Sequence, residues 1–330
     1  MSARLMARAL ILLSVLLLFI QTISAPVSAL PLAQSAVEPQ ISARAAILVE
    51  YPSGRIIYQK GAHQQLAPAS TTKILTAILA MERGNLNEAV SVASEDMIRG
   101  SKMGLKSGEK QTMHNLLYGL MLPSGNDAAM TIARHIGSQK AGSGAASKES
   151  VTAFAGLMNA RLAQLGLKES HFVNPHGLDK TGHYSSAYDL ASLTWHAMHF
   201  PVFNEIVKQP SYNVPGHSLR NINKMIVEYP GADGAKTGYT RRAGLCLVTT
   251  ATRNGRRLIS VVLNAPKWYD DSKALLDYGF AQAAGGSKGS DVERLAIARR
   301  AAGEASVASA GLFTKMLPCL RLYCSVRWCS

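Results

Sequence analysis

Three short motifs whose residue types could carry out acyl transfer follow one another along the 330-residue chain. They are Ser70-Thr71-Thr72-Lys73, Ser124-Gly125-Asn126 and Lys236-Thr237-Gly238. A serine hydroxyl can attack a carbonyl carbon when a nearby amine takes its proton, and Lys73 would lie one helical turn from Ser70. Acyl transfer also needs a hydroxyl and an amide, which the second motif places on a loop, and a cationic strand edge would hold an acidic substrate terminus. The ordered trio predicts a serine nucleophile.

Each motif also has a second copy, so the pattern alone does not locate the site. The second copies are Ser107-Gly108-Glu109-Lys110, Ser211-Tyr212-Asn213 and Lys180-Thr181-Gly182. A serine and a lysine three residues apart face the same way only on a helix, whereas Ser107 is followed by a glycine turn. Lys236 continues an extended segment, whereas Lys180 lies in a loop rich in glycine and histidine. Context therefore favours the first copies.

Taken one at a time, the motifs keep simpler structural interpretations. Ser70 could be an ordinary residue at a helix start and Lys73 a solvated lysine, although Lys73 leads into an apolar helix where burying its charge would be costly. Ser124-Gly125-Asn126 follows Leu122-Pro123 and is also typical of a turn. We expect it to be an interhelical loop.

The elements that must position these residues can be placed by hydrophobic periodicity and turn residues. Strand patterns cover 45–51, 55–59, 231–239, 245–252 and 256–263, and Asn254-Gly255 is typical of a two-residue hairpin turn. Helical patterns cover 69–83, 112–122, 128–136, 151–165, 187–198 and 272–280. The fold class expected is α/β (α+β): an antiparallel sheet flanked by helices, with an all-helical subdomain inserted between its two parts.

The N-terminus has the pattern of an export signal. Arg4 and Arg8 precede an apolar run over 9–20, and the small-residue site Val27-Ser28-Ala29 follows. We expect a signal peptide at 1–29, a spacer at 30–42, one catalytic domain at 43–284 and a tail at 285–330. A single membrane anchor is the alternative for the leader, but its apolar run is short for a bilayer. The tail is expected to be disordered or to lie on an anionic membrane surface.

Charge and cysteine content narrow the partners. A formal net charge of +14 suits the anionic polymers and lipids of a cell envelope, or simple solubility. Export and the lack of interleaved aromatic and basic residues argue against nucleic acid. The spacing of Cys319, Cys324 and Cys329 fits neither a disulfide framework nor a zinc site. A cluster in the segment 171–183 is a weak zinc alternative, and we expect no metal.

Beyond the trio, five ordered segments resemble the penicillin-binding proteins, in particular their D-alanyl-D-alanine carboxypeptidase branch. These segments are Ala67 to Lys73, Pro123 to Ala128, Phe172 to Leu178, His183 to Leu190 and Asp233 to Thr240. The resemblance covers about 43–280 and implies a fold of the β-lactamase and transpeptidase type. It implies an exported enzyme that removes the terminal D-alanine from peptidoglycan stem pentapeptides, is acylated by β-lactams, and needs no cofactor.

The resemblance also implies roles for individual residues. Ser70 would be the nucleophile, a neutral Lys73 its base, and Ser124 a proton relay to the leaving amine. The backbone N–H groups of Ser70 and Tyr239 would form the oxyanion hole.

The remaining positions would bind the substrate. Asn126 would orient the substrate amide and Lys73, while Lys236 and Thr237 would hold the free carboxylate. Gly238 and Tyr239, which follow them, are also expected to bind the substrate. Some relatives add an arginine after the last strand, where this chain has Ala265-Pro266-Lys267. Arg241, Arg242 or Lys267 could replace that arginine in binding the carboxylate, and the sequence does not decide among them.

Two alternatives share the motifs. A serine β-lactamase would add a Glu-x-x-Leu-Asn segment to activate the deacylating water, and this chain has none. A non-catalytic peptidoglycan-binding or β-lactam-sensing module would keep Ser70 and stall after acylation, which the sequence does not exclude.

Overall fold

The computed structural model describes residues 37–142, 144–282 and 293–302. The predicted signal peptide and the cysteines Cys319, Cys324 and Cys329 lie outside these ranges. Within them, no helix is both long enough and apolar enough to cross a lipid bilayer.

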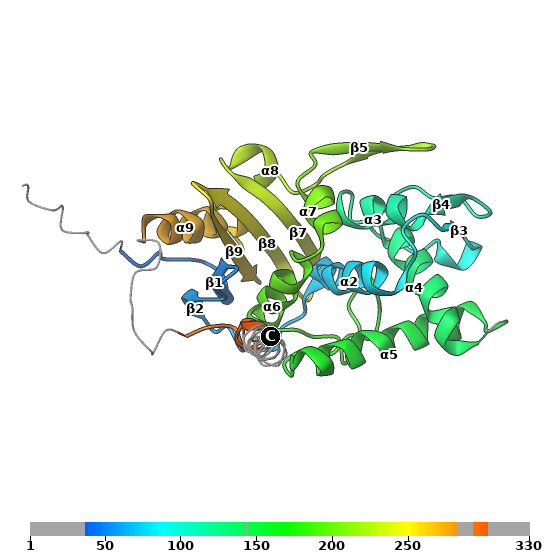
Figure 1. The fold of residues 1–330 in the computed structure, drawn as a ribbon, viewed down its shortest axis with the longest axis horizontal. Coiled ribbons are helices and arrows are strands. Elements are labelled where there is room, and N and C mark those ends of the chain that lie inside the picture. Colours follow the sequence, from blue (N-terminus) through cyan, green and yellow to red (C-terminus); the bar gives the residue numbers. More distant parts are fainter. Residues whose placement is uncertain (1–36, 143, 283–292, 303–330) are drawn as a thin grey trace, which may run out of the picture. The chain divides into compact units, whose positions relative to one another are not determined.

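A five-stranded antiparallel sheet in the order β2-β1-β9-β8-β7 forms the centre of the fold (Figure 1). Its strands are β1 (Ala45–Tyr51), β2 (Ile56–Lys60), β7 (Ala232–Thr240), β8 (Gly244–Arg253) and β9 (Arg256–Leu263). The turn between β8 and β9 is Asn254-Gly255, with φ of +50° and +74°, as a type I′ turn requires. The sheet therefore joins two strands from the first part of the described chain to three from its last part, as the sequence predicted.

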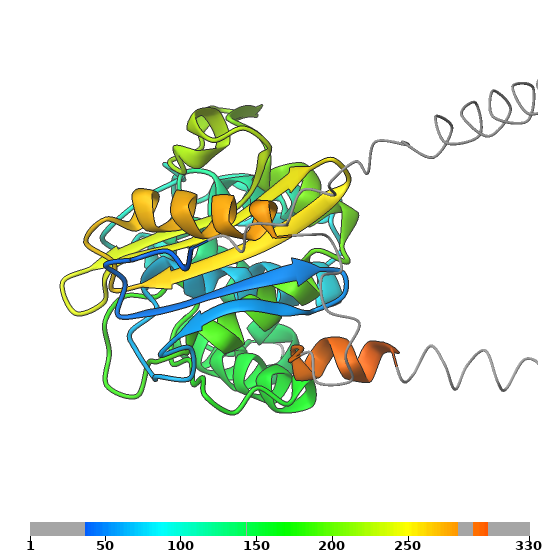
Figure 2. The same ribbon diagram turned by 90° about the vertical axis from the view of Figure 1, so that its left-hand side faces the viewer.

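Both faces of this sheet are buried, which explains its long apolar runs. Along β1, Ala45, Ile47 and Val49 join one hydrophobic core, and Ala46 and Leu48 join another. α9 (Trp268–Ala281) covers the second of these faces, where it contacts β8 and β9 (Figure 2). α2 (Lys73–Arg83) and α6 (Ala187–Ala197) lie in the core on the other face.

The chain between β2 and β7 forms a lobe that is mostly helical. It contains η2 (Ala69–Thr72), η3 (Ser94–Asp96), α3 (Met113–Met121), α4 (Asn126–Ala141), α5 (Ser147–Leu165), α7 (Pro201–Val207) and α8 (Met225–Glu228), besides α2 and α6. It also contains two small sheets, β3 (Ala89–Ser91) with β4 (Lys110–Thr112) and β5 (Ser211–Val214) with β6 (His217–Arg220). The prediction of an all-helical subdomain was therefore wrong in this respect, because strands this short carry little periodicity.

Residues 293–302, which the sequence assigned to the tail, pack onto the folded body. Ile56 donates its backbone N–H to Glu293 O, and Leu295 donates its own to Gly54 O. Leu295 is fully buried, and residues 296–302 form a helix. The domain boundary at 284 stays a prediction, but this segment belongs to the same core as β1.

Candidate active site

Ser70 lies in η2, a 3-10 helix of one turn that leads into α2. Thr71 Oγ1 donates to Pro68 O over 2.6 Å and Thr72 Oγ1 donates to Ala69 O over 2.8 Å, so the threonine side chains add hydrogen bonds to the carbonyls at the start of the turn. Ala69 has a φ of +48°, in the left-handed region that is unfavourable for a residue with a Cβ. The predicted helix over 69–83 therefore begins as a tight turn that presents a half-buried Ser70.

Lys73 is fully buried and its amine lies among three oxygen atoms. Nζ is 3.0 Å from Ser70 Oγ, 2.7 Å from Asn126 Oδ1 and 2.8 Å from the carbonyl oxygen of His176. Burial lowers the pKa of Lys73 well below its usual value, and Lys236 lowers it further, while Asp127 opposes the shift. A neutral amine has two N–H donors, which the two carbonyl oxygens accept, so its lone pair remains for the Ser70 hydroxyl.

The carbonyl of His176 comes from a loop held in place by its own side chains. Asn174 Oδ1 accepts from the backbone N–H of His176 at 3.2 Å and from that of Gly177 at 2.7 Å. Gly177 has a φ of +90°, and a Cβ there would overlap the carbonyl of Ala69. The segment Phe172 to Leu178 is part of the family resemblance, but no role could be predicted for it. Any residue type at position 176 would supply the same backbone carbonyl.

The histidines of the weak zinc alternative are engaged separately. His183 Nε2 lies 2.9 Å from Thr72 Oγ1, and its Nδ1 accepts from Val173 N at 3.1 Å. Burial lowers the pKa of His183 to about 4, so the ring is neutral and supports the turn that carries Ser70 through its contact with Thr72. Asp179 instead accepts from Thr240 Oγ1 at 2.7 Å. Within the described residues, no group of three or more His, Cys, Asp or Glu side chains is arranged to hold a metal ion.

The second motif spans a loop and a helix start. Ser124 has a φ of +62°, and its hydroxyl is buried without a hydrogen-bond partner among the described residues. Asn126, predicted in the loop, is instead the first residue of α4. Its Nδ2 donates to Arg99 O over 2.8 Å, which fixes Oδ1 toward Lys73.

Asp127 links the second motif to the preceding loop by hydrogen bonds. This role was not predicted from the sequence. The Asp127 carboxylate is buried and accepts backbone N–H groups from Met103, Gly104, Leu105 and Ala128 at 2.8 to 3.1 Å. The role of Asp127 could have been suspected from its position, because it is an acidic residue directly after Asn126 in the first turn of a helix.

The third motif lies on β7, the edge strand, as predicted. Lys236 is 1% exposed and its Nζ donates to Thr237 O over 3.0 Å; burial lowers its pKa to about 7. Thr237 Oγ1 is buried and has no hydrogen-bond partner within the described part of the chain. A Cβ at Gly238 would lie 2.9 Å from Ser70 N, so only glycine allows this close approach without movement. Tyr239 is 64% exposed.

The three motifs chosen by context thus meet, and the second copies do not join them. Ser107 precedes a glycine turn, Ser211 to Asn213 lie in β5, and Lys180 lies in the loop after Leu178. Arg241, Arg242 and Lys267, the substitutes suggested for carboxylate binding, are all exposed. This arrangement places an amine with a lowered pKa beside the Ser70 hydroxyl, next to an edge strand that carries a buried lysine.

The described geometry agrees with comparison to known proteins. A profile of the D-alanyl-D-alanine carboxypeptidase family matches residues 32–267. The chain belongs to this family. Membership confirms the resemblance inferred from the sequence.

Relatives within the D-alanyl-D-alanine carboxypeptidase family differ in how much of their length is matched. The chain is 35% identical to D-alanyl-D-alanine carboxypeptidase DacF of Bacillus subtilis over 73% of its own length, but spans 62% of that protein. It is 34% identical to D-alanyl-D-alanine carboxypeptidase DacB2 of Mycobacterium tuberculosis, over 74% of this chain and 84% of the relative. The crystal structure of the DD-transpeptidase of Streptomyces strain K15 matches with a TM-score of 0.69 and 33% identity, over 74% of this chain and 99% of that one. This similarity confirms the predicted fold class.

Proposed function

We propose that this protein is an exported serine-type D-Ala-D-Ala carboxypeptidase that removes the terminal D-alanine from peptidoglycan stem pentapeptides through a Ser70 acyl-enzyme. The observation that carries the proposal is the buried amine of Lys73, 3.0 Å from Ser70 Oγ and held by two carbonyl oxygens. Family membership supplies the substrate class.

Lys73 acts as the general base in the first step. Its lowered pKa makes the neutral amine available, and the lone pair takes the Ser70 proton as Oγ attacks the carbonyl carbon of the terminal peptide bond. Asn126 Oδ1 and His176 O keep the amine in place during the transfer.

Backbone N–H groups stabilise the tetrahedral intermediate. The N–H of Ser70 and that of Tyr239 form the oxyanion hole, and the absence of a side chain at Gly238 keeps the approach to Ser70 N open. Ser124, whose hydroxyl has no partner among the described residues, relays a proton to the departing amine. Water then hydrolyses the acyl-enzyme.

Lys236 and Thr237 hold the substrate carboxylate. Lys236 has a pKa of about 7 without ligand, and an adjacent carboxylate favours its charged form. The Thr237 hydroxyl, buried and unpaired within the described ranges, supplies a hydrogen bond to the same group. Penicillin, which also carries a carboxylate beside a reactive carbonyl, is expected to acylate Ser70.

Release of D-alanine from a pentapeptide ending in D-Ala-D-Ala tests the proposal. The Ser70→Ala variant should lose release and penicillin acylation, and Ser107→Ala, at the exposed second copy of the motif, should keep both. Unchanged release by Ser70→Ala would refute the nucleophile assignment. Fast β-lactam turnover without D-alanine release would instead indicate a β-lactamase, and a stable acyl-enzyme without release a sensing module.

Export is tested separately by sequencing the N-terminus of the mature protein. Cleavage after Ala29 is expected from the leader, in which Arg4 and Arg8 precede the apolar run. An intact N-terminus on protein recovered from the cytoplasm would contradict export.

A further inference from the structure

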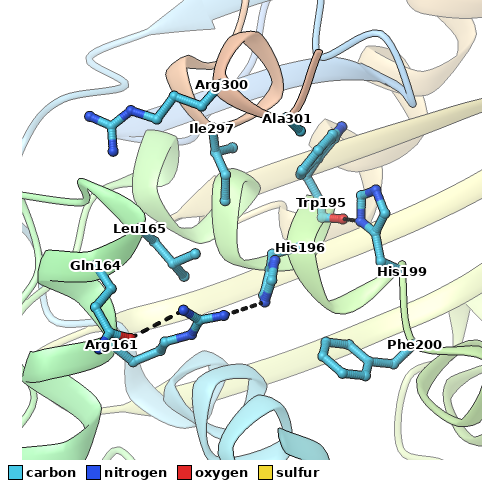
Figure 3. A pocket seen from close by; sticks show the side chains of 10 residues that line it. All are labelled: Arg161, Gln164, Leu165, Trp195, His196, His199, Phe200, Ile297, Arg300 and Ala301. Carbon is cyan, nitrogen blue, oxygen red and sulfur yellow. Dashed lines mark hydrogen bonds between the residues drawn. The ribbon is translucent and has the colours of Figure 1, made fainter. Parts of the chain in front are cut away.

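A cavity of about 440 Å³ lies apart from the Ser70 site. It is enclosed by α5, by the end of α6 with the residues that follow it, and by the helix of residues 296–302 (Figure 3). None of the residues that line it belongs to the three motifs. The volume falls within the range of roughly 300–1,000 Å³ that is usual for small-molecule sites.

One part of the wall is apolar and aromatic. Leu165, Trp195, Phe200 and Ile297 line it from three different segments of the chain (Figure 3). The indole N–H of Trp195 donates to Pro52 O over 3.0 Å, so its polar atom is already satisfied. The ring of His199 lies 4.3 Å from that of Trp195. This wall fits an apolar chain or ring.

The polar part of the wall contains two arginines, Arg161 and Arg300. Among the described residues no acidic side chain lines the cavity, although Glu82 is paired with the lining residues Arg161 and His196. Arg161 is already engaged, because its Nη2 donates to Glu82 Oε1 over 2.6 Å and its Nη1 to Gln164 Oε1 over 3.2 Å. Arg300 is exposed and makes no hydrogen bond or ion pair with any described residue. Its guanidinium lies beside Gly166, where a Cβ would come within 2.6 Å of a guanidinium nitrogen.

We propose that this cavity binds an amphipathic anion, an apolar chain or ring that carries one carboxylate or phosphate group. The apolar part would lie against Leu165, Trp195 and Ile297, and the anionic group would pair with Arg300. Residues 303–330 of this chain are a poorer occupant, since they contain Lys315, Arg321 and Arg327 against the single acidic residue Glu304. The site is independent of the proposed carboxypeptidase reaction.

Calorimetric titration of the protein with three ten-carbon probes tests the proposal. Decanoate and decyl phosphate represent the two possible anionic groups, and decanol is the neutral control; all are used below the concentrations at which they aggregate. Both anions, or one of them, should bind about tenfold or more tightly than decanol, as loss of one charge-assisted contact implies. Equal binding of anions and decanol, or no binding of any probe, overturns the proposal.

Variants locate the binding. Arg300→Gln should weaken anion binding about tenfold, whereas Arg299→Gln, at an exposed position on the same helix that does not line the cavity, should not. Ala301→Trp should fill the cavity and abolish binding, and Ser70→Ala should bind as the parent does. Anion binding that survives both Arg300→Gln and Ala301→Trp, in variants with the parent's melting temperature, places the ligand elsewhere and overturns the proposal. D-alanine release should be unchanged in Arg300→Gln, which separates this test from that of the carboxypeptidase.

Discussion

Gly238 and Ser70 approach so closely that a Cβ on residue 238 would stand 2.9 Å from the backbone nitrogen of Ser70. Gly238→Ala should therefore displace β7 from the proposed oxyanion hole and slow penicillin acylation by about 10²-fold, the usual cost of losing one oxyanion donor. Gly156→Ala is the control, because a Cβ there meets nothing within 4 Å and alanine favours the α5 helix. If the Gly238→Ala variant is acylated at the parent rate, Gly238 is not needed to keep the approach to the Ser70 N–H open.

Lys73→Met should slow acylation by roughly 10²- to 10⁴-fold, because it removes the proposed general base while keeping a side chain of similar length. Stopped-flow measurement with a fluorescent penicillin gives the rate, and a thermal melt confirms that the variant is folded. Lys110→Met changes the lysine of the exposed second copy and should have no effect. A folded Lys73→Met protein that acylates normally would require another base.

Lys236 should make the free energy of unfolding rise with pH. Its pKa is about 7 in the folded protein and 10.5 ordinarily, so between these values the unfolded chain binds more protons and raising the pH favours folding. Burial raises the pKa of Cys246 to about 11, which acts in the opposite direction at the upper end of the window. The quantity to measure is thus the difference in melting temperature between the parent and Lys236→Met, from pH 7 upward. A difference that does not change with pH would contradict the lowered pKa.

Asp127→Asn should both destabilise the protein and shift its pH profile. Asparagine cannot accept all four backbone N–H groups that the carboxylate accepts, and a lost buried hydrogen bond costs about 1–3 kcal/mol. Lys236 and Asp127 act on the pKa of Lys73 in opposite directions, so removing the negative charge lowers that pKa further. The acid limb of the acylation rate should move to lower pH.

Asp270→Asn, in the exposed first turn of α9, is the matched control for Asp127→Asn and should leave the pH profile in place. An unshifted acid limb in Asp127→Asn, with lower stability, would reduce Asp127 to a purely structural role.

Much of the fold could be predicted because its signals are local. The Asn254-Gly255 turn and the alternating cores of β1 follow from turn chemistry and hydrophobic pattern. Short features could not be predicted in the same way: β3 and β4 have three residues each, and η2 is a four-residue turn that begins at Ala69 with a φ of +48°.

The site was predictable where side chains define it and not where the backbone does. Ser70, Lys73 and Lys236 have residue types that indicate their chemistry. The carbonyl of His176 does not, since any residue at that position has one; it is placed by Asn174 and by the packing of Gly177 against Ala69. The bonds of Asn174 are local, but the contacts of this loop with Lys73 and Ala69 join segments about a hundred residues apart, which no local pattern indicates.

The two buried hydroxyls of Ser124 and Thr237 have a consequence for substrate choice. Neither has a hydrogen-bond partner among the described residues, so a ligand that offers no acceptor there leaves both desolvated and unpaired. Each such omission costs about 1–3 kcal/mol, or roughly tenfold or more in the specificity constant. A peptide whose C-terminus is amidated still offers a carbonyl oxygen to Thr237, but it lacks the negative charge that would favour the charged form of Lys236. Such peptides should therefore be rejected mainly by the charge that they lack at Lys236.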